Sequence, residues 1–264
     1  FSIWDKEKEC LYLARDRVGE KPLYYGFINE DFVFTSELKS LNFYPGYIKK
    51  IDNNSVKELI DKGYICSPRS IDKNFKKIDP GTYLIKEKNN EIKIIRYWDK
   101  YNQFENEVSD YKKSNDIENK VEHLLNNSLS GQLYADVPVG VFLSGGIDSS
   151  LITALISKNH NNKIKTFTIG FKEDDHNEAN QAQLISKYLK TDHNEFYLDS
   201  KIALDIIPNL SNIYCEPFGD SSQIPTKIVS NIAKQNVSVA ISGDGGDELF
   251  GGYNRYTQAQ RFFR

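Results

Sequence analysis

Residues 140–151 read GVFLSGGIDSSL, and this stretch decides the fold class. An apolar run from Val139 to Leu143 ends in a loop of glycine, serine and aspartate, and the apolar stretch SLITALISK follows. A strand that passes through such a loop into a helix is typical of a parallel α/β sheet. The loop offers unencumbered backbone N–H groups, hydroxyls and the positive end of a helix, which are the means of binding phosphate.

The sequence from Asp116 onward alternates between helical and strand patterns. Helical spacing begins at residue 117, with Asp116 as its expected cap, and further helices are expected near 150–158, 177–190, 201–214 and 221–235. Strands are expected at 139–143, 165–171, 193–198 and 237–242, and the last one runs into GDGGDELFGGY. This alternation predicts a doubly wound parallel sheet, in which ligands bind beyond the carboxyl ends of the strands. The two glycine-rich loops are therefore expected to form one site.

Residues 1–98 have a different pattern, which indicates strands and turns. Short aromatic-rich runs such as CLYLARD and DFVFTSEL are separated by charged or Gly/Pro turns, as in β-hairpins. Residues 77–99 form another expected hairpin, with a turn at Pro80–Gly81 and a tip at Asn89–Asn90. Residues 100–116 are polar with few aliphatic side chains, so we expect a linker there between domains at 1–99 and 117–264.

Composition excludes several classes of protein. A net charge of −3 argues against a nucleic-acid partner held by bulk electrostatics, and no apolar run approaches the ~20 residues that span a bilayer. The three cysteines form no Cys-x-x-Cys pair and the four histidines show no metal-ligand spacing, which fits a cytoplasmic protein without a zinc site.

The first loop departs from the common phosphate-binding motifs. It has neither the lysine of the Walker loop nor the Gly-x-Gly-x-x-Gly of dinucleotide-binding folds. Asp148 in such a loop would repel a phosphate unless a cation lay between them, so the residues imply Mg²⁺. Asp247 and Asp244 on the second loop are candidates to complete the coordination of that ion.

Several segments carry a resemblance to known enzymes. SGGIDSS (144–150) resembles the pyrophosphate loop of the ATP pyrophosphatases, which split ATP into AMP and pyrophosphate. ISGDGGDELFGGYNRY (241–256) and EPFGDSSQIPT (216–226) are similar to segments of glutamine-hydrolysing asparagine synthetases. LARDRVGEKPLYYG (13–26), FTSELKSL (34–41) and KIDPGTYL (77–84) resemble the end of the glutaminase domain of that family. The matches run in the same order over nearly the whole chain.

The resemblance implies two domains of known type. Residues 117–264 would be the N-terminal part of an ATP-pyrophosphatase synthetase domain, with an adenine nucleotide α-hydrolase-like doubly wound α/β fold. Residues 1–99 would be the C-terminal part of a β-rich N-terminal-nucleophile hydrolase domain. The nucleophilic cysteine would precede Phe1, and Cys10 in its expected strand cannot replace it. Arg15, Asp16 and Glu37 are expected to brace the sheet or the domain interface. Residue 1 is Phe, the sequence contains no Met, and it stops at Arg264 just after a glycine-rich motif that should lead into a helix. We therefore expect a fragment truncated at both ends.

The resemblance also implies roles for site residues. Leu143 and Ile169 would contact the nucleotide through backbone groups, as would Ser242 and Gly243, while Asp148 and Asp247 would hold Mg²⁺. Asp244 would be catalytic, although the family often has glutamate at this position. For Glu178 and Asp220 we weigh evenly a place in the nucleotide-binding cleft and a role as solvated side chains. The β,γ-pyrophosphate would be cradled by Ser144, Gly145, Gly146, Asp148, Ser149 and Ser150.

The implied function is that of a ligase in asparagine biosynthesis, with ATP and Mg²⁺ as cofactors. The β-carboxylate of aspartate would be adenylated, with release of AMP and pyrophosphate, and then amidated by ammonia derived from glutamine. Two alternatives stay open: the same chemistry on another carboxylate, such as a sugar acid, and a non-catalytic nucleotide-binding relative. The expected partners are these small molecules and, as a hypothesis, a second copy in a homodimer, with neither nucleic acid nor membrane. A lysine that supports the chemistry in the family would lie beyond Arg264.

Overall fold

The structure of the chain is a computed structural model that describes residues 1–101, 116–160, 163–171 and 177–262. It divides into two compact units. The first unit comprises Phe1–Ser114 and Pro208–Asp220, and the second comprises Asn115–Ile207 and Ser221–Arg264. Most of the linker expected at 100–116 lies outside the described residues. The segment 208–220, which we assigned by sequence to the second domain, packs instead with the first unit.

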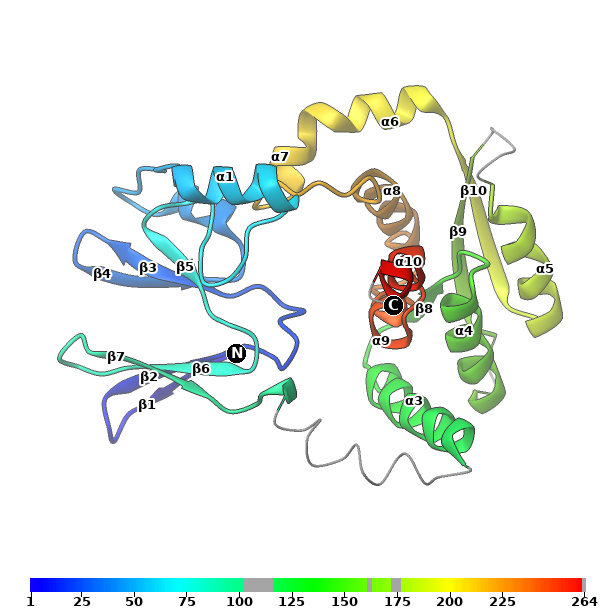
Figure 1. Cartoon of the computed structure of the whole chain (residues 1–264), viewed down its shortest axis with the longest axis horizontal. Helices are drawn as coiled ribbons and strands as arrows, with labels where there is room; N and C mark the ends of the chain where they lie inside the picture. Colours follow the sequence, from blue (N-terminus) through cyan, green and yellow to red (C-terminus); the bar gives the residue numbers. More distant parts are fainter. Residues whose placement is uncertain (102–115, 161–162, 172–176, 263–264) are drawn as a thin grey trace. The chain divides into compact units, whose positions relative to one another are not determined.

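The first unit contains two antiparallel sheets that face each other. One has the order β1-β2-β6-β7 and the other the order β4-β3-β5, as Figure 1 shows. Adjacent side chains of β3 point to opposite faces, so Tyr25 packs with Leu13 and Leu84 between the sheets. Tyr24 packs on the other face, which α1 covers. The strand bounds are Ser2–Asp5 (β1), Cys10–Ala14 (β2), Tyr24–Ile28 (β3), Asp31–Thr35 (β4), Phe75–Lys77 (β5), Thr82–Lys86 (β6) and Ile92–Arg96 (β7).

The expectation of only strands and turns in residues 1–98 is wrong at two places. A 3-10 helix spans Leu38–Phe43 (η1), and an α-helix spans Asn53–Lys62 (α1). The signals for α1 are at its ends: the Asp52 carboxylate accepts a hydrogen bond from the Asn54 N–H, and Gly63 ends the helix in the left-handed conformation. The expected hairpin is confirmed, since β6 pairs with β7 and Asn90 occupies the left-handed region at its tip.

Arg15 and Asp16, which we expected to brace the sheet or the domain interface, form hydrogen bonds within the first unit. The Arg15 guanidinium donates to the carbonyl oxygens of Lys21, Ile78 and Gly19. The Asp16 carboxylate accepts from the backbone N–H groups of Glu20 and Lys21, and these hydrogen bonds hold its pKa below the usual value against the opposing effect of burial. Both side chains therefore fix the loop that connects β2 to β3.

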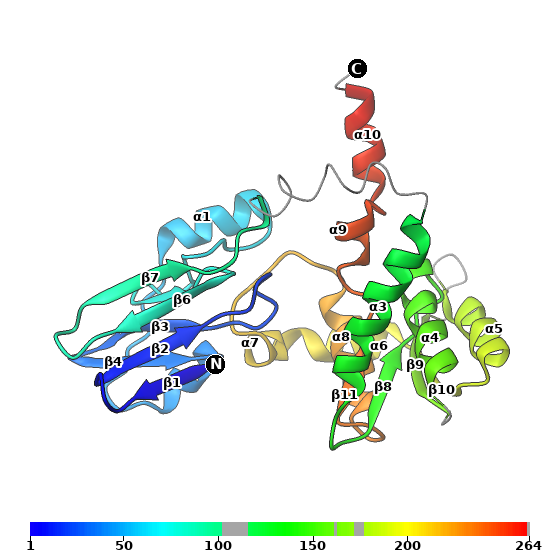
Figure 2. The ribbon, with the colours of Figure 1, turned by 90° about the horizontal axis from the view of Figure 1, so that it is seen from below.

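The second unit is built on a parallel sheet with the order β10-β9-β8-β11, visible in Figure 2. The strands are Val139–Phe142 (β8), Lys165–Phe171 (β9), Asp192–Leu198 (β10) and Val239–Ile241 (β11). The chain moves outward from β8 to β9 and β10, and it returns to the other side of β8 for β11. The predicted parallel α/β sheet is confirmed.

Helices cover both faces of this sheet, as a doubly wound fold requires. Leu129 of α3 and Ile156 of α4 pack with Val141 of β8 on one face. Ala233 of α8 packs with Phe167 of β9 on the other. The helices of this unit are Ile117–Leu133 (α3), Ile147–Asn159 (α4), Ala179–Leu189 (α5), Ser200–Ile206 (α6), Gln223–Ala233 (α8), Gly246–Phe250 (α9) and Asn254–Phe262 (α10).

The expected cap of α3 and the expected absence of a membrane-spanning segment can be compared with the described structure. Asp116 occupies the cap position of α3, but its carboxylate accepts from the side-chain amide of Asn119 rather than from a backbone N–H. Among the described helices none is long and apolar enough to cross a membrane.

His193 on β10 is a half-buried histidine with an unsatisfied nitrogen. Its Nδ1 lies 2.9 Å from the Thr166 hydroxyl, whereas Nε2 is buried without a hydrogen-bond partner among the described residues. Burial disfavours the charged imidazolium, so the pKa of His193 is lowered from its ordinary value of 6.5. Since the unfolded chain binds this proton more readily, the stability that His193 contributes is complete above about pH 6.5 and is lost as the pH falls through the folded pKa.

We therefore expect the free energy of unfolding to decrease as the pH is lowered below about 6.5, and His193→Asn to remove part of that decrease. Urea unfolding of both proteins at a series of pH values measures the two slopes. The variant His160→Asn, at an exposed position after α4, serves as the control and is expected to keep the wild-type slope. Equal slopes for wild type and His193→Asn would contradict the prediction.

Candidate functional site

The sheet of the second unit has its topological switch point between β8 and β11. The chain runs from β8 to β9 and β10 on one side and then crosses back to place β11 on the other side of β8. In parallel α/β sheets a crevice at the carboxyl ends of the strands is expected where the strand order reverses in this way. A cleft of about 850 Å³ lies there, a size suited to a small-molecule ligand. Most of the sequence-predicted residues line it: Leu143, Ser144, Gly146, Asp148, Ser149, Ile169, Ser242, Gly243, Asp244 and Asp247.

The first loop is held in shape by its own serines. The Ser149 hydroxyl accepts from the Ser144 N–H at 3.2 Å and lies 3.0 Å from the Ser144 hydroxyl. The Ser144 hydroxyl in turn accepts from the Gly146 N–H at 3.3 Å. Gly146 occupies the cap position of α4 without a side-chain cap, so the first N–H groups of this helix are not satisfied by a cap and can bind an anion.

Gly145 and Ser150 do not line the cleft. Gly145 adopts a φ of 83°, and a Cβ there would stand 2.9 Å from the backbone nitrogen of Ala182, so this glycine lets the loop pack against α5. The Ser150 hydroxyl donates to the Gly146 carbonyl at 2.6 Å. In this structure both residues support the loop.

The backbone of Leu143 already has partners. Its N–H donates to the Phe167 carbonyl at 3.0 Å, and its carbonyl accepts from the Thr168 hydroxyl. A carbonyl oxygen has a second lone pair, so any backbone contact from Leu143 to a nucleotide must use that one. Ile169 follows in β9 and also lines the cleft.

The second loop packs directly onto the first, and glycines make this approach feasible. A Cβ on Gly243 would stand 2.9 Å from the backbone nitrogen of Ser149. A Cβ on Gly246 would stand 2.5 Å from the carboxylate of Asp148. The two loops therefore form one wall of the cleft, as the sequence predicted from their positions at strand ends.

The charge of the cleft is acidic. Asp148, Asp244, Asp247 and Glu178 line it, and its described lining contains no lysine, arginine or histidine. A polyphosphate in this cleft would be repelled unless a cation shared the site. No three His, Cys, Asp or Glu side chains of the described chain cluster tightly enough to enclose a metal by themselves. Asp148 and Asp247 suit Mg²⁺, which binds one or two carboxylates and completes its shell with phosphate oxygens and water.

Some lining residues were not predicted from the sequence. Phe142, Phe171 and Phe250 contribute aromatic rings, and Ser222 with Pro225 and Thr226 lines the cleft from the start of α8. The last three fall within the segment 216–226 quoted above, so a signal for them existed. Of the two undecided carboxylates, Glu178 lines the cleft, whereas Asp220 belongs to the first unit.

The chain is similar to known proteins over its whole length. Residues 120–264 match the asparagine synthase family, and residues 1–98 match a glutamine amidotransferase domain family. A Methanocaldococcus jannaschii protein, provisionally named asparagine synthetase (glutamine-hydrolysing) 2, is 38% identical over 99% of this chain and 50% of its own length. Asparagine synthetase (glutamine-hydrolysing) 1 of Bacillus subtilis is 33% identical over 98% of this chain and 40% of its own length. The chain thus spans half or less of these relatives.

Among solved structures, an NH3-dependent NAD synthetase from Campylobacter jejuni is similar to part of the chain. The two sequences are 16% identical, and the match covers 52% of this chain and 60% of the synthetase chain, with a TM-score of 0.39. A score this low does not establish a shared fold.

The close approach of the two loops leads to a stability prediction. We expect Gly243→Ala to destabilise the second unit by about 1–3 kcal/mol, because its methyl group would press on the backbone of Ser149. Urea unfolding measures this loss. Gly131→Ala in α3 is the control, since a Cβ there meets nothing within 4 Å and alanine favours the helix. Wild-type stability for Gly243→Ala would show that the loops separate freely.

Proposed function

The chain belongs to the asparagine synthase family, and from this premise we propose that the protein synthesises asparagine with ATP and a nitrogen donor. In the proposed reaction, ATP adenylates the β-carboxylate of aspartate and pyrophosphate leaves. Ammonia derived from glutamine then displaces AMP. A cytoplasmic location and a homodimer remain predictions.

One observation carries the proposal: two glycine-rich loops meet at the switch point of a parallel sheet and line the same cleft. The first loop presents the N-terminal end of α4, and its hydroxyls come from Ser144 and Ser149. These groups are suited to the β,γ-pyrophosphate, because backbone N–H groups and a helix end stabilise negative charge without reorganising. The rings of Phe142, Phe171 and Phe250 provide apolar surface for a base.

Asp148 and Asp247 would hold Mg²⁺ in this cleft. The ion, when bound, neutralises phosphate charge and stabilises the departing pyrophosphate. Gly246 contributes by letting its backbone lie against the Asp148 carboxylate, which restricts where that carboxylate can stand. Asp244 lies in the same cleft, where its N–H donates to the Ser242 hydroxyl at 3.4 Å, and it is our candidate for the residue nearest the reacting carboxylate.

The acceptor and the nitrogen source rest on family membership. The described lining of the cleft holds no basic side chain that would recognise a second carboxylate. The match of residues 1–98 to a glutamine amidotransferase domain supports glutamine as the donor. Another carboxylic acid as acceptor is therefore an outcome that the first experiment must distinguish.

We expect the full-length protein, supplied with ATP, Mg²⁺, ammonium and aspartate, to form AMP and pyrophosphate only when aspartate is present. Chromatography of the nucleotides identifies the product. ADP and phosphate would contradict the adenylation chemistry. AMP formation with a sugar acid and not with aspartate would keep the chemistry and replace the acceptor.

We expect Asp148→Asn and Asp247→Asn each to weaken Mg²⁺-dependent ATP binding tenfold or more, about 1.4 kcal/mol, because each removes a charge that holds the ion. Isothermal titration with ATP at fixed Mg²⁺ measures the dissociation constants. The control is Asp136→Asn, an exposed carboxylate that does not line the cleft and is expected to bind ATP normally. Wild-type affinity in both cleft variants would show that these carboxylates do not hold the metal.

A further inference from the structure

The first unit contains a pocket of its own. Its volume is about 390 Å³, near the lower end of the range typical of small-molecule sites. Every residue that lines it belongs to Phe1–Ser114 or Pro208–Asp220, so the first unit by itself builds the pocket. It shares no lining residue with the nucleotide cleft, and the proposed reaction gives it no role.

One wall of the pocket is formed by the short helix Leu210–Ile213 (α7) and the residues that follow it. Ser211 and Asn212 line the pocket from this helix. The helix is fastened to the first unit by Lys39, whose Nζ reaches the carbonyl oxygens of Asn212 and Ile213 at 3.5 and 3.4 Å. The wall that carries these polar side chains is therefore held in place at its own backbone.

The chain directly after this wall is held by a shielded ion pair. The Glu216 carboxylate pairs with Lys77 at 2.5 Å and accepts a hydrogen bond from the Ile71 N–H at 2.7 Å. Both members of the pair are 12% exposed, so breaking it would leave a costly unpaired charge. Cys215, which precedes Glu216, packs against the apolar cluster of this unit. The pocket is therefore preformed, and a ligand need not order its wall.

Four charged side chains line the pocket, and three of them already have partners. Glu37 and Lys39 form an ion pair at 3.0 Å. The Asp72 carboxylate accepts a hydrogen bond from the Tyr47 hydroxyl, and Asp72 is 1% exposed. The fourth, the ammonium of Lys49, has no hydrogen bond or ion pair within the described part of the chain. The pocket therefore presents one open positive charge, which favours an anionic ligand.

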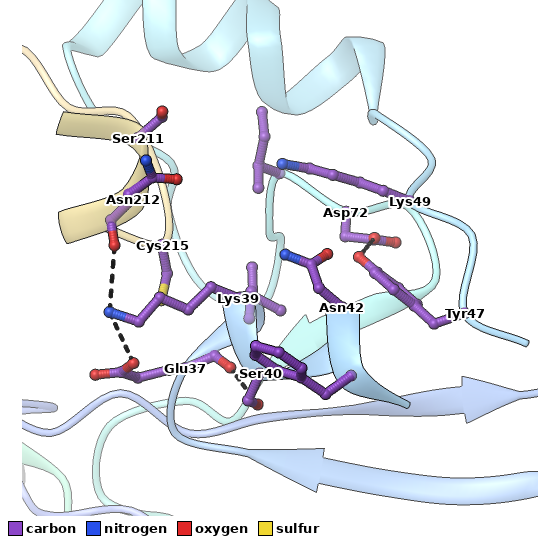
Figure 3. A pocket seen from close by; sticks show the side chains of 13 residues that line it. Glu37, Lys39, Ser40, Asn42, Tyr47, Lys49, Asp72, Ser211, Asn212 and Cys215 are labelled. Atoms are coloured by element: carbon purple, nitrogen blue, oxygen red, sulfur yellow. Dashed lines mark hydrogen bonds and ion pairs between the residues drawn. The ribbon is translucent and has the colours of Figure 1, made fainter. Parts of the chain in front are cut away.

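Uncharged polar side chains accompany this charge. Figure 3 shows the Lys49 amine and the Asn42 amide extending toward the wall formed by α7. The side chains of Asn42, Ser211 and Asn212 have no hydrogen-bond partner among the residues that the structure describes. An amide offers both donors and an acceptor, and a hydroxyl can act as either. These groups are therefore free to bind a carboxylate oxygen or a second polar group of the same ligand.

Apolar side chains complete the lining. Leu38 and Ile71 belong to the buried cluster of this unit, and Cys215 packs against them. Such a surface suits a short hydrocarbon chain. A single open ammonium matches the one charge of a carboxylate better than a phosphate group, which carries close to two.

From these observations we propose that the pocket binds a short-chain carboxylate that carries a second polar group at its other end. The carboxylate pairs with Lys49, the hydrocarbon chain lies against Leu38 and Ile71, and the second polar group bonds to Ser211 and Asn212. The site is separate from the nucleotide cleft, and the inference does not depend on the proposed function.

The probe for this site is succinamate, a short chain with a carboxylate at one end and an amide at the other. Its matched neutral ligand is succinamide, in which an amide replaces the carboxylate. We expect the full-length protein to bind succinamate, and to bind succinamide about tenfold more weakly or less, because the charge-assisted hydrogen bond to Lys49 is lost. Isothermal titration measures both dissociation constants.

Variants locate the binding. We expect Lys49→Met to weaken succinamate binding about tenfold or more and to leave succinamide binding unchanged. Asn212→Leu is expected to weaken the binding of both, since it removes a partner of the amide end. The matched control is Lys50→Met, at the neighbouring exposed lysine, which does not line the pocket and is expected to keep the wild-type affinity. Circular dichroism checks that each variant is folded.

Three results would overturn the proposal while the proposed function stands. They are a wild-type protein that binds no succinamate, equal affinities for succinamate and succinamide, and an equal loss of affinity in Lys49→Met and Lys50→Met. Absence of aspartate-dependent AMP formation in a protein that binds succinamate as expected would instead overturn the proposed function alone.

Discussion

The candidate site depends on the backbone contact between Gly243 and Ser149. Parallel pairing of β11 with β8 brings the two loops to the same edge of the sheet, but only a residue without a side chain allows the second loop to lie against the first. Gly246 repeats this arrangement against Asp148. Because the loops are in direct contact, the carboxylates of both face one cleft, and the helix end of α4 opens into it.

In the cleft, the backbone groups and the side chains favour ligands of opposite charge. The α4 terminus and the loop N–H groups favour an anion, whereas Asp148, Asp244, Asp247 and Glu178 disfavour one. The magnesium–nucleotide complex that we propose as ligand would reconcile the two, with its phosphates bound by the backbone donors and its cation held by the carboxylates. The aromatic side chains of the lining would provide apolar surface for the base of the proposed nucleotide.

Residues 208–220 show how a division of the chain by sequence can differ from the packing of its two units. Residues 208–220 lie between helices of the second unit, and a division by sequence keeps them there. Glu216, however, finds its counter-ion in Lys77 and its backbone donor in Ile71, more than a hundred positions earlier. No local pattern reports such a contact. The helix α1 was missed for a different reason, since its cap Asp52 and stop Gly63 were present in the sequence but lay in a region dominated by strand patterns.

The sequence by itself determined the alternation of strands and helices in the second unit, the parallel sheet and the loops that would share a cleft. These features follow from local apolar periodicity and from glycine, which act over a few residues. Only the tertiary structure decided which residues of those loops face the cleft, that Gly145 and Ser150 support the loop from outside, and that the Leu143 N–H is committed to β9. It alone placed Asp220 with the first unit and Glu178 in the cleft, because burial and pairing over long separations depend on how the whole chain packs.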